Sequence, residues 1–166
     1  LRFEHIPDVS SMMRSSSIVI VAQRLVRKVC NDCGRDAMPS SDLLRELRYA
    51  ETASETTRFR FGHGCVSCRG SGYLGRTGIF EILVVGPEMR EALTRNPPAS
   101  AIRRLARKDP SFLSLRQAGL LKACRGITTL EEIRRLAPAA EEAPPGKEAD
   151  TYRDLLEKAG VGFDTM

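Results

Sequence analysis

Four of the chain's five cysteines stand in two Cys-X-X-Cys pairs. Their thiols are the groups most able to do chemistry in this sequence. Two thiolates three residues apart on a tight turn can bind one metal ion together. Two such turns complete a tetrahedral sulfur site, which is the geometry that Zn²⁺ takes in structural sites. The sequence therefore predicts a structural zinc ion with the ligands Cys30, Cys33, Cys65 and Cys68. Two disulfides, or unrelated buried thiols, are the alternatives.

Two further residues could take part in such a site. His63 stands two residues before Cys65 and could give a Cys₃His site, but four cysteines already suffice, so we expect a loop residue. Cys124 is unpaired in the sequence, and we predict a small buried apolar residue rather than a reactive thiol. Four thiolates leave no open coordination position, so the predicted zinc is structural and not catalytic.

Other sets of catalytic or phosphate-binding residues cannot be assembled from the sequence. The two histidines, His5 and His63, lie far apart, and the 166 residues contain neither an HExxH nor a GxxxxGK[ST] motif. We therefore predict no catalytic residue and no cofactor-binding residue. Reasoning from the residues alone gives a basic α+β domain that a zinc ion holds together.

The charge is distributed unevenly along the chain. The net charge is +5, but residues 139–166 hold three Lys or Arg against seven Asp or Glu. A basic body could meet nucleic acid, acidic lipid or an acidic protein, although an Arg-rich solvated surface is the simpler interpretation. No apolar run approaches the roughly 20 residues that cross a bilayer, and no signal peptide is visible. A reducing cytosolic compartment is expected, in which paired Cys-X-X-Cys motifs indicate metal more often than disulfide.

The hydrophobic pattern predicts the elements that position the cysteines. Apolar residues recur at helical spacing from Ile18 to Val29, which predicts an amphipathic helix over residues 15–29 that ends at Cys30. Short strands are predicted at 58–61, with both phenylalanines on one face, and at 79–85. Further helices are predicted at 42–50, 87–95, 100–108 and 112–123. A last helix begins at Thr128 or Thr129, where a Thr-X-X-Glu pattern predicts a capping box.

Three motifs occur in a fixed order along the chain. They are A-Q-R-L-V-R-K-V-C-N-D-C at 22–33, G-C-V-S-C-R-G-S-G-Y-L-G-R-T-G-I-F-E-I-L at 64–83 and G-I-T-T-L-E-E at 126–132. Together they resemble the C-terminal part of the type II secretion and type IV pilus assembly ATPases, over about residues 15–138. The resemblance implies an α+β chain: the end of a RecA-like α/β ATPase core, then a tetracysteine zinc subdomain and a small helical C-terminal region.

The same resemblance implies boundaries within the chain. Residues 1–29 would be a remnant of the ATPase core, and residues 30–70 the zinc subdomain. Residues 71–137 would be a strand plus a helical subdomain, and residues 138–166 a linker and acidic tail. Four cysteines at the positions of Cys30, Cys33, Cys65 and Cys68 hold zinc in that family.

The family implies an ATP-hydrolysing motor, but the chain departs from it in one respect. Members are cytoplasmic homo-hexamers that act peripherally at an inner-membrane platform and use ATP with Mg²⁺. Their Walker A and Walker B segments precede the matched region and cannot be placed in residues 1–14. The 166 residues alone are therefore expected to be inactive, and Leu1 as first residue is compatible with a piece of a longer motor. A stand-alone zinc-binding interaction module, or less readily a nucleic-acid-binding zinc ribbon, are the alternatives, and no nucleic-acid partner is expected.

Overall fold

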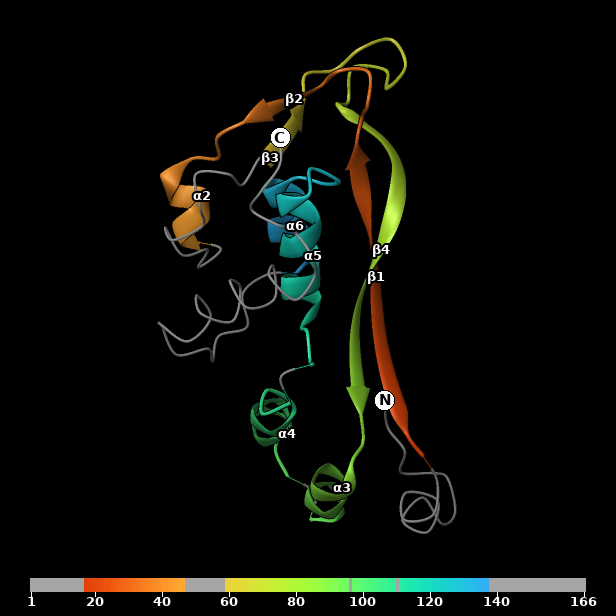
Figure 1. Ribbon diagram of the computed structural model, residues 1–166, viewed down its shortest axis with the longest axis vertical. Helices are drawn as coiled ribbons and strands as arrows, with labels where there is room; N and C mark the ends of the chain where they lie inside the picture. The colour runs from red at the N-terminus through yellow and green to blue at the C-terminus, as the bar shows by residue number, and fades with distance from the viewer. Residues whose placement is uncertain (1–16, 47–58, 96, 110, 138–166) are drawn as a thin grey trace, which may run out of the picture. The chain divides into compact units, whose positions relative to one another are not determined.

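The computed structural model describes residues 17–46, 59–95, 97–109 and 111–137 (Figure 1). Strands and helices are mixed along these residues, in agreement with the predicted α+β class. The strands are β1 (Val19–Val29), β2 (Gly34–Ala37), β3 (Phe59–Gly62) and β4 (Tyr73–Val84); the helices are α2 (Ser41–Glu46), α3 (Pro87–Thr94), α4 (Ala99–Ala106), α5 (Leu115–Cys124) and α6 (Leu130–Leu136). None of the helices in this described part is long and apolar enough to cross a membrane. The predicted linker and tail lie outside the described residues.

The predicted helix over residues 15–29 is wrong, because residues 19–29 form strand β1. The apolar residues do fit a helical spacing, but many are β-branched, among them Val19, Ile20 and Val21, and such side chains favour the pleated backbone of a strand. Strand β1 pairs with β4, which lies some fifty residues later in the sequence. Local periodicity cannot detect such a distant partner, and the pairing decides the conformation.

Two small sheets are formed by the described residues. Strands β1 and β4 make one of them and run side by side in Figure 1 with their arrows in opposite directions. Strands β2 and β3 make the other, antiparallel, with Gly34 opposite Gly62 and Ala37 opposite Phe59. Strand β2 was not predicted. The predicted strand with two phenylalanines is found as β3: Phe59 is buried beside helix α5, whereas Phe61 is exposed.

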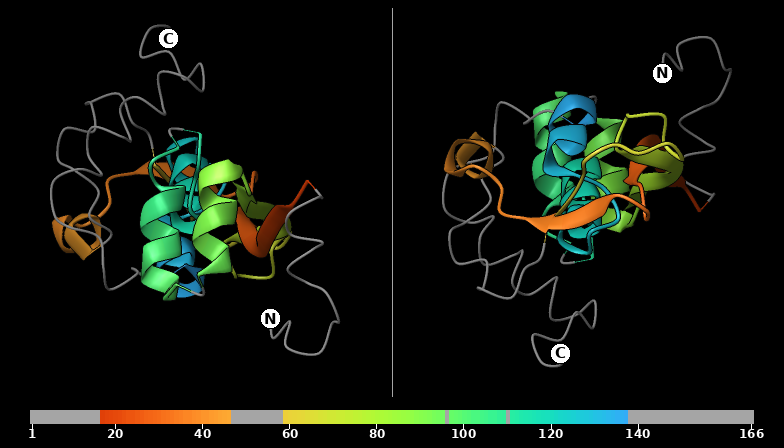
Figure 2. Two further views of the ribbon diagram at one scale, coloured as in Figure 1. Left: turned by 90° about the horizontal axis from the view of Figure 1, so that it is seen from below. Right: turned by 90° about the horizontal axis from the view of Figure 1, so that it is seen from above.

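The contacts divide the chain into two compact units, and each unit combines two chain segments. One unit contains residues up to Ala22 together with Phe80–Ser114. Its helices α3 and α4 contact each other and lie side by side in Figure 2. Pro87 stands at the start of α3, as predicted, because its fixed φ suits the first helical turn. Its buried apolar cluster consists of Val85, Met89 and Ala106, with partly buried neighbours around them.

The other unit contains Gln23–Ile79 together with residues from Leu115 onward, and it carries the cysteine pairs. Its apolar core is larger; the fully buried hydrophobic residues are Val26, Ile79, Leu120, Ala123 and Ile133. Cys124 is buried in this core, which confirms the prediction of a small buried residue. Helix α6 begins after Thr129, whose side chain accepts a hydrogen bond from the Glu132 N–H, so the predicted helix start is confirmed.

Candidate metal centre

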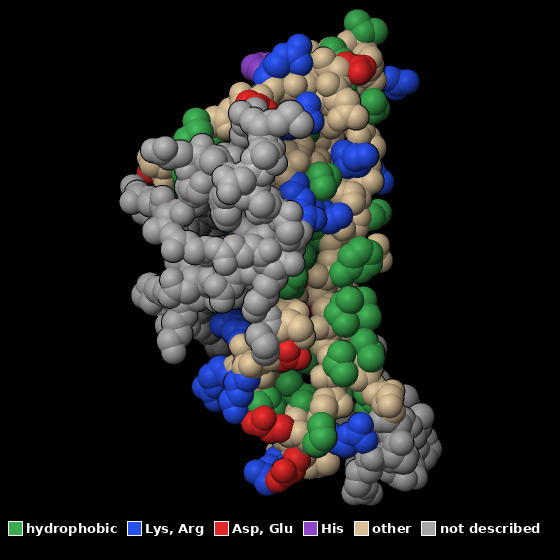
Figure 3. All heavy atoms as spheres, viewed as in Figure 1, with side chains coloured by type: hydrophobic (Ala, Val, Ile, Leu, Met, Phe, Trp, Pro, Cys, Tyr) green, Lys and Arg blue, Asp and Glu red, His purple; other side chains and the backbone are tan. Residues whose placement is uncertain are grey.

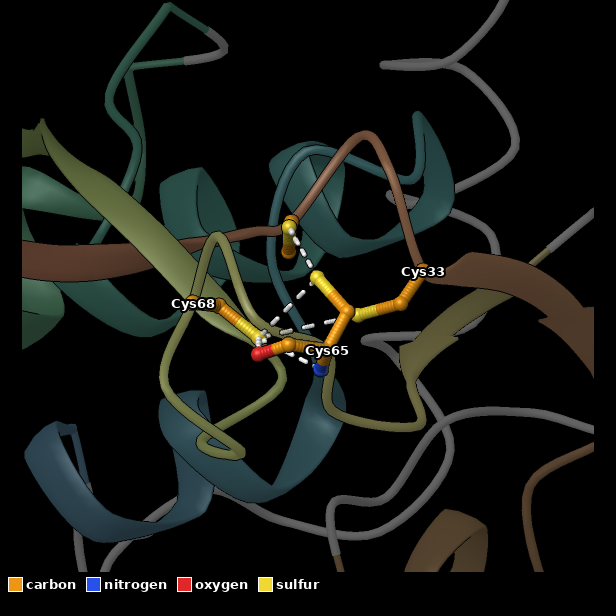
Figure 4. A group of neighbouring side chains, drawn as sticks. Cys33, Cys65 and Cys68 are labelled. Carbon is orange, nitrogen blue, oxygen red and sulfur yellow. Dashed lines mark hydrogen bonds between the residues drawn. The ribbon is translucent and has the colours of Figure 1, made fainter.

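The cysteine pairs come together from two connections between strands. Cys30 directly follows β1 and Cys33 directly precedes β2, while Cys65 and Cys68 lie in the loop between β3 and β4. In Figure 4 the side chains of Cys33, Cys65 and Cys68 point toward one another. All four Sγ atoms lie within 4.8 Å of one another.

The sulfur geometry fits a tetrahedral metal ion. The Sγ atoms of Cys30 and Cys65 are 3.8 Å apart, those of Cys33 and Cys68 are 3.8 Å apart, and those of Cys65 and Cys68 are 3.7 Å apart. A tetrahedron with Zn–S bonds of about 2.3 Å has sulfur–sulfur edges of about 3.8 Å. All five cysteines of the chain are free thiols in this structure. The donor set therefore suits a zinc ion rather than two disulfides.

Backbone contacts hold the two cysteine turns face to face. The Gly34 N–H donates to the Cys30 carbonyl at 2.8 Å and closes the first turn, and the Cys30 N–H donates to the Gly72 carbonyl at 2.9 Å beside the second. A Cβ added at Gly62 would lie 2.0 Å from the Gly72 carbonyl oxygen, so only glycine allows this approach of the two backbones. The arrangement of the sulfurs is thus built into the chain.

Backbone N–H groups also contact the sulfurs directly. The N–H of Gly64 donates to Cys33 Sγ at 3.3 Å, and the N–H groups of Cys65 and Gly72 donate to Cys68 Sγ at 3.2 and 3.3 Å. Burial raises the pKa of Cys33 to about 12. Burial acts in the same direction on Cys68, but the donors from Cys65 and Gly72 outweigh it and lower its pKa to about 6. The N–H donors of Cys65 and Gly72 therefore favour the thiolate form of Cys68, which is the form that ligates a metal ion.

His63 lies beside the cysteines without joining the group that could hold a metal ion, which consists of the four cysteines. Its backbone N–H donates to the Cys33 carbonyl at 3.2 Å, and its ring packs edge-on against Phe61 at 5.7 Å between centroids. It is a loop residue that supports the first turn, in line with the prediction.

The sequence did not predict that a buried carboxylate, that of Glu132, binds the strand that leads to the first cysteine pair. The side chain of Glu132 has no exposed surface, and its oxygens accept hydrogen bonds from the guanidinium groups of Arg27 and Arg135 and from the Arg27 backbone N–H. Burial raises the pKa of Glu132, but the bonds from Arg27 and Arg135 outweigh burial and lower it to about 2. The sequence signal was the Thr-X-X-Glu pattern, which predicts a helix start but not the arginines that bury its glutamate.

Comparison with known proteins decides the family. The family model described as "Type II/IV secretion system protein" matches residues 1–135 of the chain. The chain belongs to this family. The match includes all four cysteines and Glu132, so the candidate metal centre and the buried carboxylate both lie in the family region of the chain.

Relatives within the type II/IV secretion system family are similar over most of this chain. The type IV pilus assembly ATPase PilB of Thermus thermophilus is 42% identical over 116 residues, which are 70% of this chain and 13% of that protein. A putative type II secretion system protein E of Escherichia coli is 37% identical over 136 residues, 81% of this chain and 27% of that protein. The type II secretion system protein E of Aeromonas hydrophila is 38% identical over 125 residues, 75% of this chain and 24% of that protein. The chain thus spans about a quarter or less of the length of these curated relatives.

Proposed function

We propose that this chain is the zinc-binding portion of an ATPase that powers type II secretion or type IV pilus assembly. The observation that carries the proposal is the clustering of the Cys30, Cys33, Cys65 and Cys68 sulfurs, which all lie within 4.8 Å of one another. The family match and the names of the relatives, type II secretion system protein E and type IV pilus assembly ATPase, support the assignment to such a machine.

A bound zinc ion would act as a cross-link with no open position for catalysis. Cys30 and Cys33 hold the end of β1 and the start of β2, and Cys65 and Cys68 hold the loop that leads into β4. Joining these segments shortens the free chain between them and so reduces the conformational entropy of the unfolded state. The four cysteines would therefore stabilise the unit that contains them.

We further propose that ATP hydrolysis, hexamer formation and contact with an inner-membrane platform in the cytoplasm are activities of a complete motor. In this proposal residues 1–29 belong to a RecA-like core, 30–70 to the zinc subdomain, 71–137 to a helical C-terminal subdomain and 138–166 to a linker and acidic tail.

A sheet of only two strands is marginally stable by itself, and β1 and β4 expose large apolar side chains. In the unit that contains α3 and α4, the exposed apolar side chains of these two strands are Val19, Ile20, Val21, Phe80, Ile82 and Val84.

These exposed side chains support a larger body around the strands. Figure 3 shows hydrophobic side chains gathered in a band over β1 and β4. Val84, the last residue of β4, is 62% exposed, and Val21, the third residue of β1, is 56% exposed. Burial of such side chains is worth about 1.5–3 kcal/mol each, so a surface of this kind is typical of an interface with further protein.

Metal analysis of the purified 166-residue chain tests the proposal. We expect one zinc ion per chain, and, after exchange for Co²⁺, the absorption bands of a four-thiolate site. ATP turnover should be absent from the chain alone. A preparation that binds neither Zn²⁺ nor Co²⁺ would overturn the metal centre, and ATP hydrolysis by the 166 residues would contradict the assignment of catalysis to the rest of a motor.

A further inference from the structure

The corner between α5 and α6, residues 126–132, lies along the end of β1 immediately before the first cysteine. The Val29 N–H donates to the Ile127 carbonyl at 2.9 Å, and Thr128 Oγ1 donates to the Arg27 carbonyl at 2.8 Å. The Glu132 carboxylate accepts a hydrogen bond from the Arg27 N–H at 3.1 Å. The corner thus binds backbone groups of two of the three residues that precede Cys30, and fixes where the first metal ligand lies.

Glu132 is the charged centre of this corner. Its Oε2 accepts bonds from Nε and Nη2 of Arg27 at 2.9 and 2.7 Å, and its Oε1 accepts a bond from Nη2 of Arg135 at 3.0 Å. Two cations and a backbone N–H therefore satisfy a carboxylate that has no exposed surface. Loss of one partner of a buried ion pair is strongly destabilising, because the remaining charge stays buried without a compensating interaction.

The same network reaches the second cysteine turn through Tyr73. The Arg27 guanidinium lies 4.0 Å above the centre of the Tyr73 ring, and the Tyr73 hydroxyl shares a 2.8 Å hydrogen bond with Thr129 Oγ1. Tyr73 directly follows Gly72, whose N–H donates to Cys68 Sγ and whose carbonyl accepts the Cys30 N–H. One side of the network therefore ends at Cys30 and the other beside Cys68.

We infer that Glu132 is a positioning residue of the metal centre: it clamps Arg27 to the α5–α6 corner, so that metal release and opening of this corner are coupled. The inference rests on the proposed metal centre. Coupling of this kind is reciprocal, because whatever holds the corner closed must favour the bound metal to the same extent that the metal favours the closed corner.

Zinc release from the full 166-residue chain measures the coupling. The zinc-loaded wild type, Glu132→Gln and the matched control Glu131→Gln are mixed with an excess of a chromophoric chelator, and the rate of zinc transfer is recorded. Glu131 is the exposed neighbour of Glu132 on α6. We expect Glu132→Gln to release zinc at least about 10-fold faster, since loss of groups that orient metal ligands weakens metal sites by about 10–100-fold. Glu131→Gln should stay within about twofold of wild type.

Equal release rates for Glu132→Gln and Glu131→Gln would overturn the inference while leaving the metal centre intact. A wild-type chain that holds no zinc would overturn the metal centre, and the inference with it. The two failures are therefore distinguishable by the zinc content of the wild type before the chelator is added.

Hydrogen exchange on the wild type decides the matter if Glu132→Gln does not fold. Chelation of the zinc should reduce the protection of the Arg27 and Val29 amides, which donate to the corner. The amide of Arg90, which donates to Gly86 in the other compact unit, should keep its protection. Unchanged protection of Arg27 and Val29 after chelation would show that the corner and the metal centre are independent.

Discussion

The two compact units differ in the contacts that stabilise each of them internally. The cysteine-bearing unit combines the larger apolar core with directional contacts between distant residues, such as Arg27 with Glu132, which stand 105 residues apart, and Cys30 with Cys65, which stand 35 apart. The α3–α4 unit depends on a small apolar cluster around Met89 and on ion pairs between exposed side chains. Directional contacts tolerate few residue types, whereas apolar burial tolerates many. The cysteine-bearing unit should therefore be far more sensitive to single substitutions than the unit that contains α3 and α4.

Removal of one metal ligand should give the largest difference between the units. Cys33→Ser should lose the zinc and destabilise its unit by more than about 5 kcal/mol, because zinc contributes about 10–16 kcal/mol in small zinc domains. Hydrogen exchange should report loss of protection in α5 and α6 but not in α3 and α4. Cys124→Ala is the matched control, since Cys124 lies in the apolar core and should leave zinc content unchanged. Full zinc content in Cys33→Ser would contradict the assignment of this ligand.

Truncation of isoleucine in the two units should give the next largest contrast. Ile133 is completely buried, whereas Ile82 is 50% exposed on β4. Ile133→Ala should lower the free energy of unfolding by about 2–5 kcal/mol, through lost apolar burial and the cavity left behind. Ile82→Ala should cost below about 1 kcal/mol in the isolated chain, because half of the side chain is already in water. Urea denaturation of both variants measures the difference, and equal costs would show that Ile82 is as buried in solution as Ile133.

The starts of helices α6 and α3 provide a smaller and opposite pair of effects. Thr129 caps α6 by accepting from the Glu132 N–H, whereas Gly86 precedes α3 without a side-chain cap. Thr129→Ala should destabilise its helix by about 1–2 kcal/mol, since N-cap side chains contribute about that much. Gly86→Ser should stabilise α3 by a few tenths of a kcal/mol, and a Cβ there meets no atom within 4 Å. The amide exchange rate in the first turn should rise in α6 of Thr129→Ala and fall in α3 of Gly86→Ser. An unchanged rate in Thr129→Ala would show that the cap does not stabilise α6.

The smallest effect is expected at the surface ion pair of the α3–α4 unit. Lys108 and Glu88 are 68% and 71% exposed in their side chains. Lys108→Ala should change the free energy of unfolding by less than about 0.5 kcal/mol, and 0.5 M NaCl should remove most of that change. A cost above about 1 kcal/mol that persists in salt would show that this unit also depends on directional contacts, and the contrast between the units would disappear.

The sequence predicted best what short-range geometry decides. The Cys-X-X-Cys spacing identified the four cysteines that the structure brings together, because a turn of four residues fixes the relative position of its two thiols. Pro87 and Thr129 marked the starts of α3 and α6 for similar reasons, since each acts on its own first turn.

Features that depend on distant partners were missed. Residues 19–29 fit a helical repeat, but their β-branched side chains pair with β4, and the repeat carries no information on that strand. Strand β2 was missed as well, because it pairs with β3, which begins more than twenty residues later in the sequence. The burial of Glu132 follows from Arg27, whose partner cannot be read from nearby residues. The membership in the type II secretion and type IV pilus assembly family was predicted correctly from the three ordered motifs.

The distance between Arg27 and Glu132 along the chain has a consequence for synthesis on the ribosome. The two residues are separated by 105 positions, whereas the first and last cysteines of the centre are separated by 38. At about 5–20 residues per second, Glu132 is made roughly 5–20 s after Arg27, and the thiols are complete well before it. With the proposed zinc centre, a nascent chain would be able to bind the metal ion first, and the contact of Glu132 with Arg27 would follow only once helix α6 has emerged.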